Sequence, residues 1–460
     1  MEEAGHLTRG AVFVLALSLA STARAQVPGS SQSNPFVESS SGRALQRLFF
    51  GAIDCGPGFS EAVAFCPDDA FSQSGLFGNG TYGEIRFTFA GAALGAPNTA
   101  EILPSVAGQL TTFPSASSAT GFTYSWRNAA IPTRDSEVFG ALFGEQAVTN
   151  GRHQLSFSLN YQQLSFSRLD GQDTGLDSAG VFVGDSNYAD FGDGPAGYVA
   201  LLKLDFMQRI ATAGITFGVT DRLDVRAMAP IIWSRVEGSN EFLDFVEQPD
   251  GAVTIDPGVT FFFPQGRYFV TGESSGLGDV ELGVKFAAID SARWNVALSG
   301  GARLGTGSRD KLTGTGATKG QAAIACSLES KALTPFVWAR YTSGGGEAPE
   351  LIGSLSLAVP IGRDRVTIAG ELVGRRIFDA RILERGETVK ALVTSPVTGD
   401  VFEVRDYSAG RADIDSAFAV AGIKVRVLRQ LVGSAFVTIP LLEEQLQPGA
   451  SGSFGLSYVF

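Results

Sequence analysis

Histidine, cysteine and long apolar runs are scarce in this chain of 460 residues. It contains 2 His and 3 Cys, and His153 is the one histidine beyond residue 25. A zinc site needs about four closely spaced Cys, His or carboxylate ligands, and the three cysteines lack that spacing. We therefore expect neither a bound metal nor another cofactor.

One apolar run stands out, at residues 11–20, and no later stretch approaches its length. The run follows Arg9 and precedes Ala23-Arg24-Ala25, a pattern typical of a secretory signal peptide. As an anchor it would be too short, because a helix needs about 20 apolar residues to cross a bilayer. The sequence therefore predicts a signal peptide at residues 1–25 and excludes helical membrane spans.

Basic residues are too few for a nucleic-acid partner. Lys and Arg number 35 against 47 Asp and Glu, which gives a formal net charge of −12. A surface with this balance repels the phosphate backbone. We expect no nucleic-acid binding.

The few cysteines divide into a close pair and a single residue. Cys55 and Cys66 lie near each other in the part that would be exported. An oxidising periplasm favours a disulfide between them, which would close a short loop. Cys326 falls within an alternating pattern, and we interpret it as a buried or lipid-facing thiol.

Glycine and phenylalanine are abundant instead. The chain has 57 glycines, a share well above the roughly 7% of average usage. Its 34 phenylalanines far outnumber its 4 tryptophans and 9 tyrosines. At the C-terminus the apolar residues fall on one face of a strand: Phe454, Leu456, Tyr458 and Phe460. This is typical of the closing strand of a bacterial outer-membrane β-barrel. The alternative, a soluble β-domain, gives no reason to end on a bare aromatic residue.

Regular alternation begins at residue 151 and predicts twelve strands, with fourteen as the alternative count. Their centres lie at residues 155–162, 202–217, 223–233, 280–286, 294–304, 322–328, 333–341, 351–359, 366–372, 423–427, 431–441 and 453–460. Within the second strand the apolar residues change from even-numbered positions, such as Leu204 and Phe206, to odd-numbered positions, such as Ile215 and Phe217. We therefore expect a β-bulge near Gln208.

The connections after odd-numbered strands differ in length from those after even-numbered strands. Tight turns follow the even-numbered strands, and long loops follow strands one, three, five and nine, at residues 170–198, 237–278, 306–320 and 379–411. Short turns on one rim and long loops on the other are typical of a transmembrane barrel. We predict an all-β, antiparallel up-and-down barrel over residues 151–460. Residues 26–150 form an irregular segment that would be a plug in the lumen, a periplasmic cap or an extra hairpin.

The parity also predicts which side chains face the interior. The charged residues of this set are Lys203, Asp205, Arg226, Glu281, Lys285, Arg303, Arg340, Glu371, Arg375, Lys424 and Arg426. In a channel they would sort solutes by charge, and in a filled barrel they would pair with each other. Phe336 and Trp338 share the parity of Arg340 and would suit an amphipathic or aromatic solute. A shift of one residue in register would place both in lipid instead.

Enzymatic chemistry finds little support. An outer-membrane hydrolase would need a base beside a serine near the outer leaflet. The one mature histidine, His153, opens the first strand at the periplasmic rim. We therefore expect no enzyme activity.

The barrel strands resemble a known family in several glycine-rich stretches. These are residues 214–225, 276–282 and 305–308, together with the closing strand. Over roughly residues 151–460 the chain is similar to outer-membrane barrels of the phenol-degradation meta-pathway family, which are grouped with the fatty-acid-transporter type. The resemblance implies passage of small, hydrophobic or aromatic compounds, and a recognition signal at Tyr458 and Phe460 for the barrel-assembly machinery. Residues 26–150 depart from the family pattern.

Two functions follow as hypotheses. The first is a monomeric channel or transporter for small-molecule solutes, embedded in lipid of the outer membrane of a Gram-negative bacterium. The second is a barrel without transport activity, which acts structurally or through its long extracellular loops.

Overall fold

The computed structural model describes residues 36–38, 41, 44, 124–125, 133–134, 142–169, 172–175, 181–185, 196–247, 253–255, 266–291, 293–330, 332–361, 365–394, 401–428, 430–442 and 446–460. All of them belong to one compact unit, Phe36–Phe460. Among these residues, no helix is long and apolar enough to cross a membrane. The predicted signal peptide and the predicted Cys55–Cys66 disulfide lie outside the described residues.

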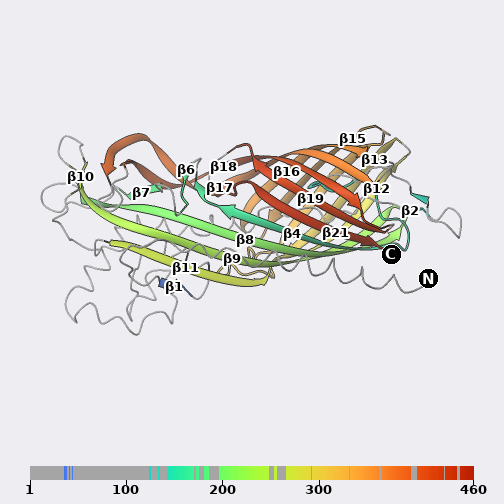
Figure 1. The fold of residues 1–460 in the computed structure, drawn as a ribbon, viewed down its shortest axis with the longest axis horizontal. Helices are drawn as coiled ribbons and strands as arrows, with labels where there is room; N and C mark the ends of the chain where they lie inside the picture. Colours follow the sequence, from blue (N-terminus) through green and yellow to red (C-terminus); the bar gives the residue numbers. More distant parts are fainter. Residues whose placement is uncertain are drawn as a thin grey trace, which may run out of the picture. The chain divides into compact units, whose positions relative to one another are not determined.

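Twelve antiparallel strands close into a barrel (Figure 1). In order around the barrel they are β4 (Leu155–Phe166), β8 (Ala196–Thr220), β9 (Leu223–Glu247), β12 (Val280–Asp290), β13 (Trp294–Leu304), β14 (Lys319–Leu328), β15 (Thr334–Gly344), β16 (Glu347–Ile361), β17 (Val366–Thr394), β18 (Val401–Arg426), β19 (Leu431–Pro440) and β21 (Ser451–Val459). The predicted barrel and its count of twelve strands are confirmed.

Nine further strands complete the described structure. They are β1 (Phe36–Glu38), β2 (Tyr124–Ser125), β3 (Thr133–Arg134), β5 (Arg168–Leu169), β6 (Gln172–Asp173), β7 (Val181–Asp185), β10 (Val253–Ile255), β11 (Gly266–Leu277) and β20 (Leu446–Gln447). β2 pairs with β3, and β20, β5 and β6 form a small sheet of their own.

The last barrel strand closes the ladder against the first. β21 pairs with β4 from Gly452↔Gln163 to Val459↔Ser156. The Phe460 N–H then donates a hydrogen bond to the Leu155 carbonyl oxygen at 2.8 Å. No edge is left at this seam, which satisfies the backbone groups of both terminal strands.

Large apolar side chains cover the outside of the barrel. Val337, Leu355 and Leu372 lie opposite one another on β15, β16 and β17 and are 52%, 51% and 56% exposed. Their strand neighbours Ser354 and Ser356 point the other way and are buried. Water would make this exterior unfavourable, whereas the hydrocarbon of a bilayer would cover it. Cys326 lies on the same exterior row, opposite Val337.

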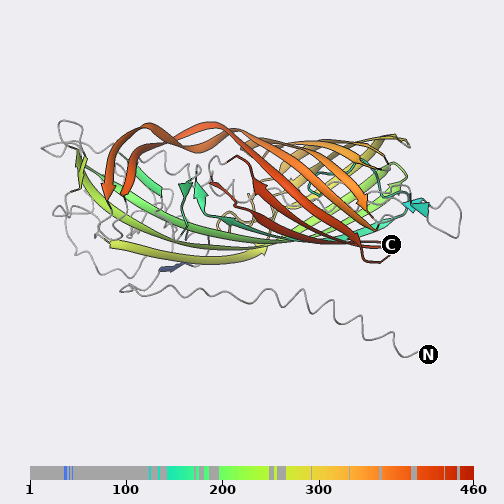
Figure 2. The ribbon, with the colours of Figure 1, turned by 45° about the horizontal axis from the view of Figure 1, so that its top comes forward.

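The short turns gather at one end of the barrel, together with the C-terminus (Figures 1 and 2). Trp294 and Phe460 are exposed at this end, and Tyr458 packs edge-on against Phe460 at 4.6 Å between ring centroids. Aromatic side chains at the edge of an apolar belt are typical of a membrane interface.

At the opposite end, several predicted loops are strands. The predicted loop at residues 237–278 contains the second half of β9 as well as β10 and β11, and most of residues 379–411 belongs to β17 and β18. β11 and β12 both pair with β9 and follow one line, interrupted at residues 278–279. β7 pairs with both β8 and β18. The pattern of alternating apolar residues did not reveal these extensions. A strand needs apolar residues outside and polar residues inside only where it borders lipid.

The predicted bulge near Gln208 is wrong. β8 pairs with β4 from Phe206 to Phe217 without a register shift, and its ladder with β9 shifts near Gly218 and Thr220. Leu204 and Phe206 therefore lie on the interior face, where an apolar cluster buries them. Lys203 and Asp205 alternate with these residues along β8, and Lys203 is itself buried, so their predicted place in the lumen stays a prediction. The parity change in the sequence marks an apolar patch inside the barrel.

The connection after β13 folds inward across the barrel, although we expected an outside loop. Residues 305–318 wrap around Asp279: its Oδ1 accepts from the Gly307 N–H at 3.0 Å, and its Oδ2 accepts from the Thr315 N–H and hydroxyl, both at 2.9 Å. A Cβ on Gly314 would run into this carboxylate. At the tip, the Leu312 carbonyl accepts from Gln208 Nε2 at 3.1 Å and from Ser234 Oγ at 3.2 Å. The glycine-rich sequence thus builds an inward loop.

The apolar belt predicts a large cost for charge on the exterior. Leu355→Arg should lower the free energy of unfolding in lipid vesicles by about 2–4 kcal/mol, the range for a midplane cation on a barrel. Chemical denaturation monitored by tryptophan fluorescence measures this. Asp310→Arg, on the exposed part of the inward loop, is the control and should change stability by less than about 0.5 kcal/mol. Equal effects of the two substitutions would contradict a lipid-facing belt.

The Asp279 contacts predict that this carboxylate holds the inward loop closed. Asp279→Ala leaves the Gly307 and Thr315 N–H groups without their acceptor, at a cost of about 1–3 kcal/mol for each unsatisfied group. Trypsin cleavage after Arg309 and Lys311 should become faster in native protein. Asp290→Ala, at an exposed turn, should leave the cleavage rate unchanged. An unaltered rate in Asp279→Ala would refute the role of Asp279.

Candidate functional site

The interior of the barrel contains a segment of the chain that precedes the first barrel strand. Residues 142–150, called here the plug segment, are buried at nearly every position. Their hydrogen-bond partners come from the interior faces of β9, β12, β13 and β17. This described part of residues 26–150 therefore lies inside the barrel, and its role as a plug stays a prediction.

Glu371 on β17 binds the far end of the plug segment. Its Oε2 accepts from the backbone N–H groups of Leu142 at 3.0 Å and Phe143 at 2.8 Å, and its Oε1 accepts from Gly144 N–H at 2.9 Å. Three successive N–H groups converging on one carboxylate form an anion-binding concavity. A single interior side chain thus positions this end of the segment.

An ion pair and a lysine hydrogen bond hold the middle of the plug segment. Glu145 Oε1 lies 2.8 Å from Arg226 Nη1, and its Oε2 accepts from Ser299 Oγ at 2.9 Å. Lys285 Nζ donates to the Val148 carbonyl at 2.7 Å and lies 3.7 Å from Asp224 Oδ2. These contacts reach β9, β12 and β13, so they span one side of the barrel.

The near end of the plug segment is fixed beside the short turns. The Asn150 N–H donates to Asp224 Oδ2 at 3.0 Å, and Asn150 Nδ2 donates to Ser156 Oγ at 2.8 Å. Thr149 Oγ1 donates to the Asp221 carbonyl at 2.7 Å. The segment therefore enters the barrel from the short-turn end, directly before β4.

Gly144 permits the close approach of the plug segment to the wall. A Cβ at this position would lie 2.6 Å from Ser354 Oγ, 3.1 Å from Glu371 Oε1 and 3.3 Å from the Trp338 Cβ. Any larger residue would push the backbone away from Glu371. The glycine therefore allows the Glu371 hydrogen bonds to form.

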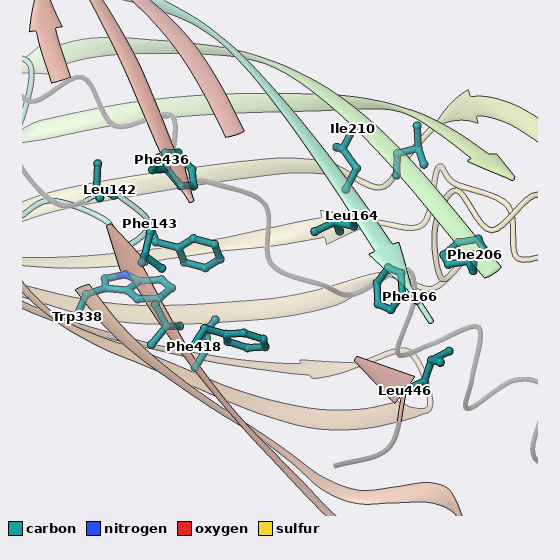
Figure 3. Packing of buried hydrophobic residues seen from close by; sticks show 14 of the residues in the cluster. Leu142, Phe143, Leu164, Phe166, Phe206, Ile210, Trp338, Phe418, Phe436 and Leu446 are labelled. Atoms are coloured by element: carbon teal, nitrogen blue, oxygen red, sulfur yellow. The ribbon is translucent and has the colours of Figure 1, made fainter. Parts of the chain in front are cut away.

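Apolar side chains line the interior at two places (Figure 3). One group surrounds the far end of the plug segment and includes Leu142, Phe143, Trp338, Phe418 and Phe436. The other includes Leu164, Phe166, Phe206, Ile210 and Leu446, with the Phe166 and Phe206 rings 5.4 Å apart. Phe336 and Trp338 are each 5% exposed and lie inside, not in lipid.

Charged interior residues form a second feature, called here the charge cluster. Its members are Glu281, Arg303, Lys319, Arg340, Glu350 and Arg375. Arg303 Nη2 pairs with Glu281 Oε1 at 2.7 Å, and Arg375 Nε pairs with Glu350 Oε1 at 3.0 Å. The Arg340 guanidinium lies 5.3 Å from the centre of the Trp338 ring, in a cation–π arrangement. The cluster thus adjoins the apolar group around Trp338.

Of the remaining predicted residues, Lys424 lies within electrostatic reach of Glu371, and others lie at the rim. Lys424 is buried on the interior face of β18, and Arg426 follows at the same parity. The Tyr458 hydroxyl and Gln430 Oε1 are 2.8 Å apart at the short-turn end. His153 is exposed there, and its backbone N–H donates to the Gly218 carbonyl at 2.7 Å. The absence of enzyme activity stays a prediction.

Several interior residues were missed. Lys319, Gln321 and Glu350 continue the parity of predicted strands by one to three residues, so longer strands would have revealed them. Asp279 lies in a glycine-rich stretch that gave no sign of its loop contacts. Glu145 belongs to an irregular segment in which no periodicity indicates a side.

Comparison with family models and with curated proteins finds no match. No protein-family model matches this chain. No curated protein matches it significantly.

Comparison of structures finds barrels at low identity. An outer membrane channel from Pseudomonas putida is 12% identical, with a TM-score of 0.41, over 68% of this chain and 98% of that one. A Pseudomonas aeruginosa FadL homologue is 11% identical, with a TM-score of 0.29, over 67% and 89%. The Pseudomonas putida toluene transporter TodX is 9% identical, with a TM-score of 0.25, over 69% and 95%. The assignment of this chain to a closed twelve-stranded barrel rests on its own strand pairing.

Proposed function

We propose that this protein is a channel of the Gram-negative outer membrane that passes small, hydrophobic or aromatic molecules. The observation that carries the proposal is a closed barrel whose interior is occupied by a segment held through noncovalent polar contacts. Such a barrel has an interior route, and the segment that fills it can be displaced.

The location is supported by the two faces of the strands. Exterior residues form an apolar belt bordered by aromatic side chains, and interior residues are polar, charged or aromatic. Closed barrels of this kind span the outer membranes of Gram-negative bacteria. The predicted signal peptide would deliver the chain to the periplasm, where Tyr458 and Phe460 would be read by the barrel-assembly machinery. The seam between β21 and β4 closes within one chain, which favours a monomer.

The solute class is supported by the apolar groups inside the barrel. Two sets of aromatic and aliphatic side chains, around Trp338 and around Phe206, share one interior with the charge cluster. A purely aqueous pore gains nothing from these side chains, whereas a hydrophobic or aromatic solute would bind them transiently. The names of the structural neighbours, which include a toluene transporter, agree with this class.

Opening requires the plug segment to move. The segment is held by three N–H bonds to Glu371, by an ion pair between Glu145 and Arg226, and by a hydrogen bond from Lys285 to the Val148 carbonyl. Hydrogen bonds to charged groups contribute about 1.5–3 kcal/mol each, so a few of them can be exchanged reversibly. Release at Glu371 would free the far end, while Asn150 would keep the near end attached to Asp224.

Removing the Glu371 charge should favour the open state. Glu371→Gln retains the size of the side chain but weakens acceptance from residues 142–144. In planar bilayers, we expect open probability to rise about tenfold or more over the unsubstituted protein. Glu350→Gln, which alters an interior carboxylate without plug contacts among the described residues, should leave the opening frequency unchanged.

A disulfide across the plug contact provides the direct test of transport. Gly144→Cys with Ser354→Cys, in a Cys326→Ala background, places two thiols where a Cβ would already lie 2.6 Å from Ser354 Oγ. Oxidised protein should block uptake of radiolabelled toluene into proteoliposomes, and reduction should restore it. Equal uptake in both states would contradict the plug. If Glu371→Gln and the reduced protein both fail to pass every apolar and aromatic solute tested, the barrel would be structural instead.

A further inference from the structure

The charge cluster carries more positive than negative charge. Arg303, Lys319, Arg340 and Arg375 are four cations, and Glu281 and Glu350 are two carboxylates, so four minus two leaves an excess of two positive charges. Asp279 is the next carboxylate: its charge acts on Arg303 and Lys319 and lowers the excess to one, while both of its oxygens accept hydrogen bonds from the inward loop. Excess charge of one sign in a partly desolvated interior is unfavourable unless a counter-charge joins it.

The excess resides on Lys319 and Arg340. Each Glu of the cluster pairs with a different partner, Glu281 with Arg303 and Glu350 with Arg375. Neither Lys319 nor Arg340 forms an ion pair within 4.0 Å of any residue that the structure describes. Lys319 is 5% exposed, and the charges of Arg303 and Glu350 act on it across the interior. Two cations are therefore available to a ligand.

Gln321 supplies uncharged polar atoms between these cations. It follows Lys319 by two residues on the interior face of β14, and its neighbour Ala323 pairs with Arg340. Gln321 is 8% exposed, yet neither Nε2 nor Oε1 has a partner among the residues described. A buried primary amide without partners costs free energy that a bound ligand would recover.

The surface below Arg340 is aromatic. Trp338 is the preceding interior residue of β15, its ring lies under the Arg340 guanidinium, and Phe336 follows in the same line. A planar guanidinium supported by an indole presents its N–H groups to an oxyanion. An anionic group at Arg340 would therefore have an apolar surface beside it.

We propose that Lys319, Gln321 and Arg340 form a binding site for an oxyanion, the carboxylate or phosphate group of a small molecule. The oxyanion accepts from Lys319 Nζ, from the Arg340 guanidinium and from Gln321 Nε2, and it neutralises the excess charge of the cluster. The inference deepens the proposed channel function by assigning it amphipathic anions as solutes. It rests on that function for the physiological role, whereas binding itself requires no transport.

Calorimetric titration of the full-length protein in detergent tests the site. The probes are sodium benzoate, inorganic phosphate and neutral benzamide. We expect benzoate, phosphate or both to bind, and the Lys319→Gln/Arg340→Gln double variant to bind about tenfold more weakly or worse, since two charged hydrogen bonds are lost. Any binding of benzamide should be the same in the double variant as in the unsubstituted protein. Binding of benzoate alone identifies an organic carboxylate as the ligand, and binding of phosphate alone identifies a phosphate group.

Arg376→Gln is the matched control, because Arg376 is exposed on the exterior and pairs with Asp415 at 2.7 Å. It should bind the anions as tightly as the unsubstituted protein. Thermal unfolding gives a second readout: the bound anion should raise the Tm of the unsubstituted protein and of Arg376→Gln, but not of the double variant. Equal affinities in the three proteins, or binding of neither anion, would overturn the site. A site that binds anions in a protein that passes no solute would instead refute the channel function alone.

Discussion

Closure of the hydrogen-bond ladder between β21 and β4 is the constraint on which the rest of this structure depends. Hydrocarbon offers no partner to a free backbone N–H or C=O group, so every strand that borders lipid needs a neighbour on both sides. The seam supplies that neighbour to the first and last strands and fixes an even number of strands. It also fixes the two faces, since alternate side chains of a closed sheet must point either outward or inward. The apolar belt and the polar interior both follow from this single pairing.

A closed barrel of twelve strands has more interior than its own side chains fill, because side chains fill a barrel of about eight strands. Two inserted elements occupy the space in the described structure. The plug segment enters from the short-turn end and binds Glu371, and residues 305–318 fold in from the other end around Asp279. Both insertions rely on carboxylates that accept backbone N–H groups. Such contacts are specific in geometry and modest in net free energy, which suits elements that must remain in place and still yield to a solute.

The two features of the interior differ in their charge balance. Around the plug segment, Glu145 and Asp224 match Arg226 and Lys285, and Lys424 balances Glu371, so three carboxylates and three cations leave this layer neutral without a ligand. The charge cluster has four cations against two carboxylates and borders the aromatic group at Trp338. An apolar molecule with an anionic end would match both surfaces, with its apolar part against the aromatic group and its anionic end at the charge cluster. In the proposed channel, the neutral layer would close the route, and the cationic layer would select the solutes that pass.

Much of the architecture was determined by the sequence alone, because a barrel strand must be apolar towards lipid at every second residue. This rule gave twelve strands, the closing role of residues 453–460 and the interior parity of residues such as Glu371 and Arg375. Where the rule stops applying, tertiary structure decided the outcome. The apolar interior patch at Leu204 and Phe206 imitated a change of parity, and the extensions of β9 and β17 beyond the belt carried no lipid-facing signal. The placement of Glu145 against Arg226, and of Asp279 within the inward loop, depends on contacts between distant parts of the chain, which periodicity within a strand cannot encode.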